Sequence, residues 1–135
     1  MTSKTFLAAL AGGVVNFLLG YVIFNLALGS FYAAHAGKGA TRAAPDMIAI
    51  GLGCLVFGFL LAFIFAQWAG IKTALGGARG GAIIGGIAGL AFALWRLGGT
   101  YVIDGYLAVF VDTIAMTVLS AATGAIVGMI LGKDK

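Results

Sequence analysis

The chain has 135 residues, of which 62% are hydrophobic and 9% charged, and its formal net charge is +4. A soluble domain of this length carries about 25% charged residues, so the composition excludes an ordinary water-soluble globular protein and indicates a membrane protein. The basic residues flank apolar segments, which is typical of anchoring in a bilayer and offers no continuous surface to nucleic acid.

Four apolar segments are long enough to cross a bilayer as helices, because about 20 apolar residues span its hydrocarbon core. They cover residues 5–28, 47–71, 78–97 and 106–131 of a single transmembrane domain, residues 1–135. The first is too long for the apolar region of a signal peptide, which has about 7–15 residues, so we expect it to be retained. The sequence therefore predicts an all-α fold, an integral membrane four-helix bundle.

The first segment carries a ladder of small residues, in which a small side chain recurs at every fourth position. Its members are Ala8, Gly12, Asn16 and Gly20. Residues four apart lie on one helix face, and small residues there let a second helix approach closely. Asn16 lies near the middle of the segment, where we expect its amide to hydrogen-bond across a helix interface. The alternative is a contact to a ligand or an ion.

The second segment carries the ladder Cys54, Gly58, Ala62, Ala66 and Gly70. Because this ladder is purely apolar and small, we expect its face to meet another molecule. The short connection that follows, about residues 72–77, predicts a tight antiparallel pair with the third segment. Cys54 is the only cysteine, which excludes a disulfide within the chain.

The third and fourth segments carry the ladders that are richest in glycine. They are Gly77, Gly81, Gly85, Gly89 and Ala93 in the third, and Ser120, Gly124, Gly128 and Gly132 in the fourth. Such small-xxx-small spacing predicts helices packed through their glycine faces. Hydroxyl groups also recur in the fourth segment, at Thr113, Thr117, Ser120 and Thr123. We expect them to bond to the preceding carbonyls of their own helix, so they do not by themselves indicate a pore.

Asp112 lies about one turn inside the apolar part of the fourth segment. A bare carboxylate there costs several kcal/mol, so it must be paired, hydrogen-bonded, protonated or open to a wet cavity. Arg96 follows the third ladder on the same face and is the nearest candidate partner. We interpret the two as a buried ion pair that fixes helix register; a proton- or cation-handling site is the alternative.

The remaining polar residues give no pattern for catalysis. The only histidine, His35, lies between the first two segments, which excludes a Ser/His/Asp arrangement inside the membrane. No cluster of Cys and His offers a metal site. We therefore expect a protein that is not an enzyme and has no cofactor or metal.

The distribution of positive residues predicts the orientation of the chain in the membrane. With the N-terminus inside, the cytoplasmic side holds Lys4, Lys72, Arg79, Lys133 and Lys135, and the other side holds Lys38, Arg42 and Arg96. Five positive residues against three place both termini in the cytoplasm.

Three stretches resemble a known group of proteins: GGVVNFLLGYVIF in the first segment, GARGGAIIG at the start of the third and ATGAIVGMILG at the end. With four apolar segments, the chain resembles the small four-helix bacterial membrane proteins grouped as domain of unknown function 1761. The resemblance implies the four-helix fold and a bacterial cytoplasmic membrane, and it implies no activity or binding residue. The small multidrug resistance transporters are of similar size, but they depend on a glutamate in their first helix and this chain has no glutamate.

Two functions follow as expectations. The first is a non-enzymatic integral membrane protein with a structural or assembly role, which associates with itself or serves as an accessory subunit of a larger complex. The second is a small proton- or cation-coupled transporter or channel that uses Asp112. A third possibility is a lipid, quinone or carotenoid held in a groove lined by glycine.

Overall fold

The computed structural model describes residues 3–27, 30, 47–99 and 105–133. In these ranges the chain forms four long helices and no strand, which confirms the predicted all-α fold. The long helices are α1 (Ser3–Tyr21), α3 (Met47–Phe63), α4 (Ala74–Gly99) and α5 (Tyr106–Leu131). Short π-helical segments extend two of them: η1 (Val22–Ala27) continues α1, and η2 (Ile64–Ala69) continues α3. Four helices are long and apolar enough to cross a membrane.

The turn between η2 and α4 is shorter than the sequence predicts. Gly70 ends η2 in a left-handed conformation with φ +62°, which glycine adopts without steric cost. Thr73 then caps α4, because its Oγ1 accepts a hydrogen bond from the backbone N–H of Gly76 at 2.9 Å. This cap satisfies a donor that the first turn leaves free, so α4 begins at Ala74 and not at residue 78.

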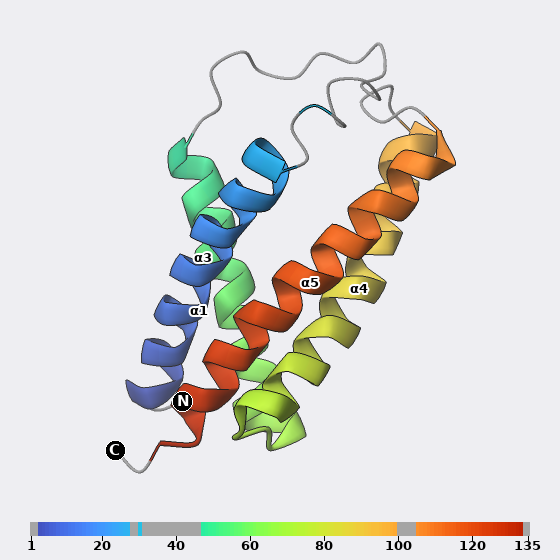
Figure 1. The fold of residues 1–135 in the computed structure, drawn as a ribbon. Helices are drawn as coiled ribbons and strands as arrows, with labels where there is room; N and C mark the ends of the chain where they lie inside the picture. Colours follow the sequence, from blue (N-terminus) through green and yellow to red (C-terminus); the bar gives the residue numbers. More distant parts are fainter. Residues whose placement is uncertain (1–2, 28–29, 31–46, 100–104, 134–135) are drawn as a thin grey trace.

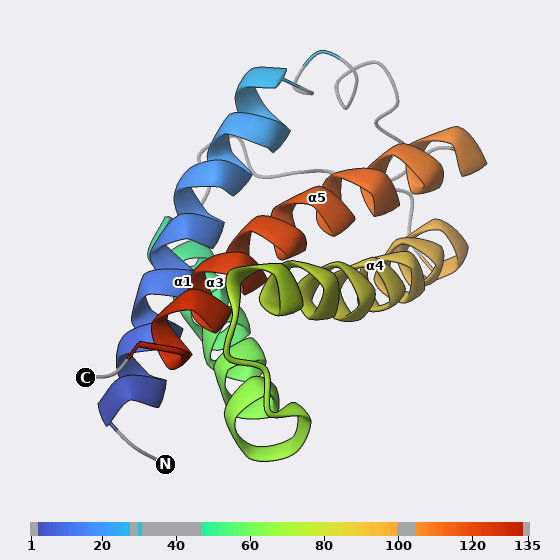
Figure 2. The same ribbon diagram turned by 60° about the horizontal axis from the view of Figure 1, so that its bottom comes forward.

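The helices are arranged as two antiparallel pairs (Figure 1). α1 packs on α3, α4 packs on α5, and the contact of α1 with α5 joins the pairs. With the bottom of the molecule turned forward, the α4–α5 pair is seen to cross the α1–α3 pair obliquely (Figure 2). The second and third predicted segments are therefore joined by a short turn but do not pack along their length. α4 makes its extensive contact with α5 and not with α3.

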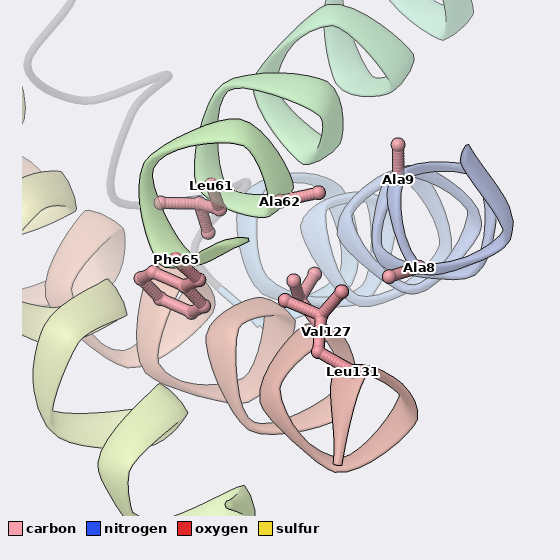
Figure 3. Packing of buried hydrophobic residues seen from close by; sticks show 7 residues of the cluster. All are labelled: Ala8, Ala9, Leu61, Ala62, Phe65, Val127 and Leu131. Carbon is pink, nitrogen blue, oxygen red and sulfur yellow. The ribbon is translucent and has the colours of Figure 1, made fainter. Parts of the chain in front are cut away.

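Small residues form most of the interior, and large apolar residues cover the outside. One buried cluster lies where α1, α5 and the continuous helix of α3 and η2 meet (Figure 3), and it consists of Ala8, Ala9, Leu61, Ala62, Phe65, Val127 and Leu131. On the outside, Ile48, Ile87 and Phe110 are each more than 60% exposed. Apolar surface of this extent is unfavourable in water and marks contact with lipid or protein.

Candidate functional site

The closest helix contact joins the glycine faces of α4 and α5. A Cβ atom built on Gly77 would lie 2.0 Å from the carbonyl oxygen of Gly124, and one on Gly81 would lie 2.1 Å from that of Ser120. A Cβ on Gly128 would come within 2.3 Å of the carbonyl oxygen of Thr73. Real Cβ atoms do not approach backbone oxygens so closely, so these positions accept glycine only at this helix separation. Backbone therefore packs against backbone along this interface.

A second close contact joins α1 to α3. A Cβ on Gly58 would lie 2.5 Å from the carbonyl oxygen of Ala9 and 2.6 Å from the nitrogen of Gly13. Ala62, one turn further along α3, is fully buried. The expectation that this ladder of α3 meets another molecule is therefore wrong at Gly58 and Ala62, because α1 already covers them.

The glycines differ in how tightly they are enclosed. On α1, a Cβ at Gly12 would meet Cγ2 of Val127 at 2.5 Å, whereas one at Gly20 would make an ordinary contact of 3.6 Å with Leu119. On α4, a Cβ at Gly89 would come within 2.8 Å of the side chain of Met116. Tight approach thus centres on the half of the α4–α5 pair where α4 begins and α5 ends, and on the crossing of α1, α3 and α5.

Asn16 lies buried between α1 and α5. Its Nδ2 donates a hydrogen bond to Oγ1 of Thr123 at 3.1 Å, and that hydroxyl donates to the carbonyl of Leu119 at 2.9 Å. Thr113 and Thr117 likewise bond to carbonyls one turn earlier in α5, as expected. The amide of Asn16 thus connects the two helix pairs through the hydroxyl of Thr123. The sequence alone did not identify Thr123 as the partner of Asn16.

Ser120 differs from the threonines of α5. Its Oγ is fully buried and has no hydrogen-bond partner among the described residues. The side chain lies over Gly85, where a Cβ would come within 1.8 Å of that oxygen. The absent side chain at Gly85 makes room for the hydroxyl, so Ser120 acts as a small packing residue at the interface.

Asp112 is buried, with 4% of its surface exposed, and it is engaged with neighbouring groups. It precedes Thr123 by eleven residues, about 16 Å along α5, so the fold does not bring it into one site with Asn16. The side chain of Arg96 lies outside the described part of the structure. The predicted pair of Asp112 and Arg96 therefore stays a prediction.

An apolar groove opens between α1 and α3 on the outside of the molecule. Its volume is about 260 Å³, and it is lined by Leu10, Gly13, Val14, Phe17, Leu18, Gly51 and Leu55. A Cβ on Gly51 would meet no atom within 4 Å. The ladders of small residues did not reveal this groove, because Gly51 is not a member of any of them and large side chains form the walls.

The described residues contain no group of three or more His, Cys, Asp or Glu that could hold a metal ion. His35 and the connection at residues 31–46 lie outside the described ranges. No protein family, no curated protein and no solved structure matches the chain. The resemblance to the four-helix bacterial group therefore stays a prediction.

Proposed function

We propose that this chain is a non-enzymatic integral membrane protein of the bacterial cytoplasmic membrane that associates with itself and has a structural or assembly role. Small residues pack inside and large apolar residues face outward, which is the distribution that a lipid solvent favours. Close approach at Gly77, Gly81 and Gly124 gives a rigid pair of helices as a scaffold.

The groove between α1 and α3 is the observation that supports self-association. Its lining is apolar, and Gly51 lets a second backbone approach α3 from outside. A helix of a second copy of the chain supplies the apolar side chains that fill such a groove. An accessory role in a larger complex would use the same surface.

Substitution of Gly51 tests this proposal directly. Because open space surrounds Gly51, Gly51→Leu fills the groove without a clash inside the chain. An overpacked contact costs about 1–3 kcal/mol, so we expect the dimer to weaken about fivefold or more. Gly53→Leu is the matched control, because Gly53 also has no neighbour within 4 Å but does not line the groove.

The measurement is the dissociation constant of the dimer in lipid nanodiscs or mild detergent, taken from energy transfer between labelled copies. Weakening in Gly51→Leu with an unchanged Gly53→Leu supports the groove as the interface. The proposal would be overturned if the unsubstituted protein stayed monomeric at every protein-to-lipid ratio and no partner co-purified with it.

A second candidate function rests on the burial of Asp112 in α5. A buried carboxylate within an apolar helix marks a site that handles protons or cations in many transporters. Asp112→Asn in a proteoliposome flux assay separates the two functions. Loss of pH-dependent flux from an intact fold supports transport, whereas loss of folding or assembly supports a structural role for the carboxylate.

A further inference from the structure

Three lysines that are far apart in the sequence meet at one end of the molecule. Lys4, in the first turn of α1, donates a hydrogen bond from Nζ to the backbone carbonyl of Lys133, which follows α5. Lys72, in the turn before α4, lies beside Gly132, because a Cβ on Gly132 would clash with the carbonyl oxygen of Lys72. The start of α1, the turn before α4 and the end of α5 lie together at one end of the molecule (Figure 1). We call Lys4, Lys72 and Lys133 the basic surface of this end.

The charge of this surface is available to a ligand. Lys72 and Lys133 are exposed, and Lys4 keeps two of its three N–H donors after its bond to the carbonyl. Asp112 is the one carboxylate among the described residues, and it lies near the other end of α5. Within the described ranges, no acidic side chain neutralises the three ammonium groups.

An aromatic residue marks the depth of this surface in a bilayer. Trp68 is 76% exposed and precedes Lys72 by four residues, at the end of η2. Its ring is held edge-on against Phe63, with 5.4 Å between the ring centroids. Exposed tryptophan is typical of the headgroup level, so the lysines lie where lipid phosphates are found.

We propose that Lys4, Lys72 and Lys133 form a binding surface for the headgroups of anionic phospholipids. This inference rests on the membrane insertion proposed above and adds a lipid partner at a defined end of the bundle. Lysines at a bilayer surface attract anionic headgroups, and phosphate oxygens accept hydrogen bonds from ammonium groups. The positive surface and the apolar helix faces beside it match the two parts of a phospholipid.

Fluorescence quenching by brominated lipid tests the proposal. The chain has two tryptophans, so that in a Trp95→Phe background the emission comes from Trp68 alone. The full chain is reconstituted in phosphatidylcholine vesicles that contain either brominated phosphatidylglycerol or brominated phosphatidylcholine at the same mole fraction. Because one lysine near an anionic surface strengthens attraction about fivefold, we expect the anionic lipid to bind beside Trp68 about fivefold more tightly or better.

Variants identify the residues responsible. The combined substitution Lys4→Gln, Lys72→Gln and Lys133→Gln is expected to bring this preference to about one, since glutamine keeps a donor and removes the charge. Lys38→Gln is the matched control, because residue 38 falls in the sequence between η1 and α3, and the end of η1 and the start of α3 lie at the opposite end from the start of α1. Circular dichroism of each variant shows whether the helices are retained.

Each outcome decides between the proposals. Equal quenching by both lipids, or a preference that survives the triple substitution, overturns the anionic-lipid surface. A preference that is lost when inorganic phosphate replaces chloride at matched ionic strength shows recognition of free phosphate, which also overturns a lipid partner. Absence of quenching by either lipid, with a chain that does not float with the vesicles, shows instead that the membrane insertion itself is wrong.

Discussion

At the scale of single residues, Asn16 shows how a polar side chain can hold an apolar bundle together. Its amide donates to Thr123, while Thr123 donates to the carbonyl of Leu119, so the shared hydroxyl uses both its donor and an acceptor position. Both side chains are buried. The bond joins α1 to α5, the contact through which the two helix pairs meet, and it therefore fixes their relative register.

Asn16→Leu removes this interhelical bond and keeps the number and branching of the side-chain heavy atoms. Hydrogen bonds between membrane helices contribute about 0.6–2 kcal/mol, so we expect stability to fall by that amount. The free energy of unfolding in mixed micelles of dodecyl sulfate, followed by circular dichroism, measures the change. Thr113→Val is the control, because that hydroxyl bonds only to Val109 of its own helix. Equal losses in both variants would contradict a special role for Asn16.

At the scale of helices, α4 and α5 pack closely because glycine, which has no side chain, recurs where they meet. Gly77, Gly81 and Gly124 bring backbone atoms of the two helices together along a shared face. Glycine weakens a helix in water by about 1 kcal/mol, but in lipid the backbone hydrogen bonds face no competition from water. The close approach gains van der Waals contact over the whole face, which offsets the loss of side-chain packing.

Gly81→Ala is expected to separate α4 from α5, since its Cβ would lie 2.1 Å from the carbonyl oxygen of Ser120. Because backbone must move to relieve this clash, we expect a loss of about 1–3 kcal/mol or more in the same unfolding measurement. Gly98→Ala on the same helix meets no atom within 4 Å, so it should be neutral or slightly stabilising. A Gly81→Ala protein as stable as the natural chain would refute the close contact.

At the scale of the whole molecule, the fold places both ends of the described chain together. Lys4 of α1 bonds to Lys133 beyond the end of α5, and the start of α5 lies at the opposite end (Figure 1). In a membrane this arrangement would place residues 3 and 133 on one side. The positive residues that gather at that end, Lys4, Lys72 and Lys133, predict that this is the cytoplasmic side.

Single cysteines in a Cys54→Ser background test this topology with a thiol reagent that does not cross membranes. In intact cells we expect Tyr106→Cys to react, since Tyr106 is 76% exposed at the opposite end, and Ser3→Cys and Lys133→Cys to react only after permeabilisation. Reaction of residues 3 and 133 from different sides would contradict the fold. Reaction of both from outside would contradict only the orientation.

Part of the candidate site could be predicted from local pattern. The position of Asn16 on a small-residue face predicted an interhelical hydrogen bond, because side chains four apart share a helix face. The partner, Thr123, could not be predicted, since several hydroxyl groups of α5 offer equivalent chemistry at different depths. The groove beside Gly51 was missed for a related reason: its walls come from two helices whose relative position no local spacing specifies.

The sequence by itself determined that the chain has four apolar helices and which face of each carries small residues. These are local properties, set by hydropathy and by the 3.6-residue period of the helix. Only the tertiary structure decided that α4 pairs with α5, that α1 covers Gly58, and that Asn16 bonds to Thr123. The sequence had already placed Lys4, Lys72 and Lys133 on one side, and the structure added the bond of Lys4 to the carbonyl of Lys133. The physical reason is that one small-residue face fits another almost equally well, so the choice of partner depends on the packing of all four helices together.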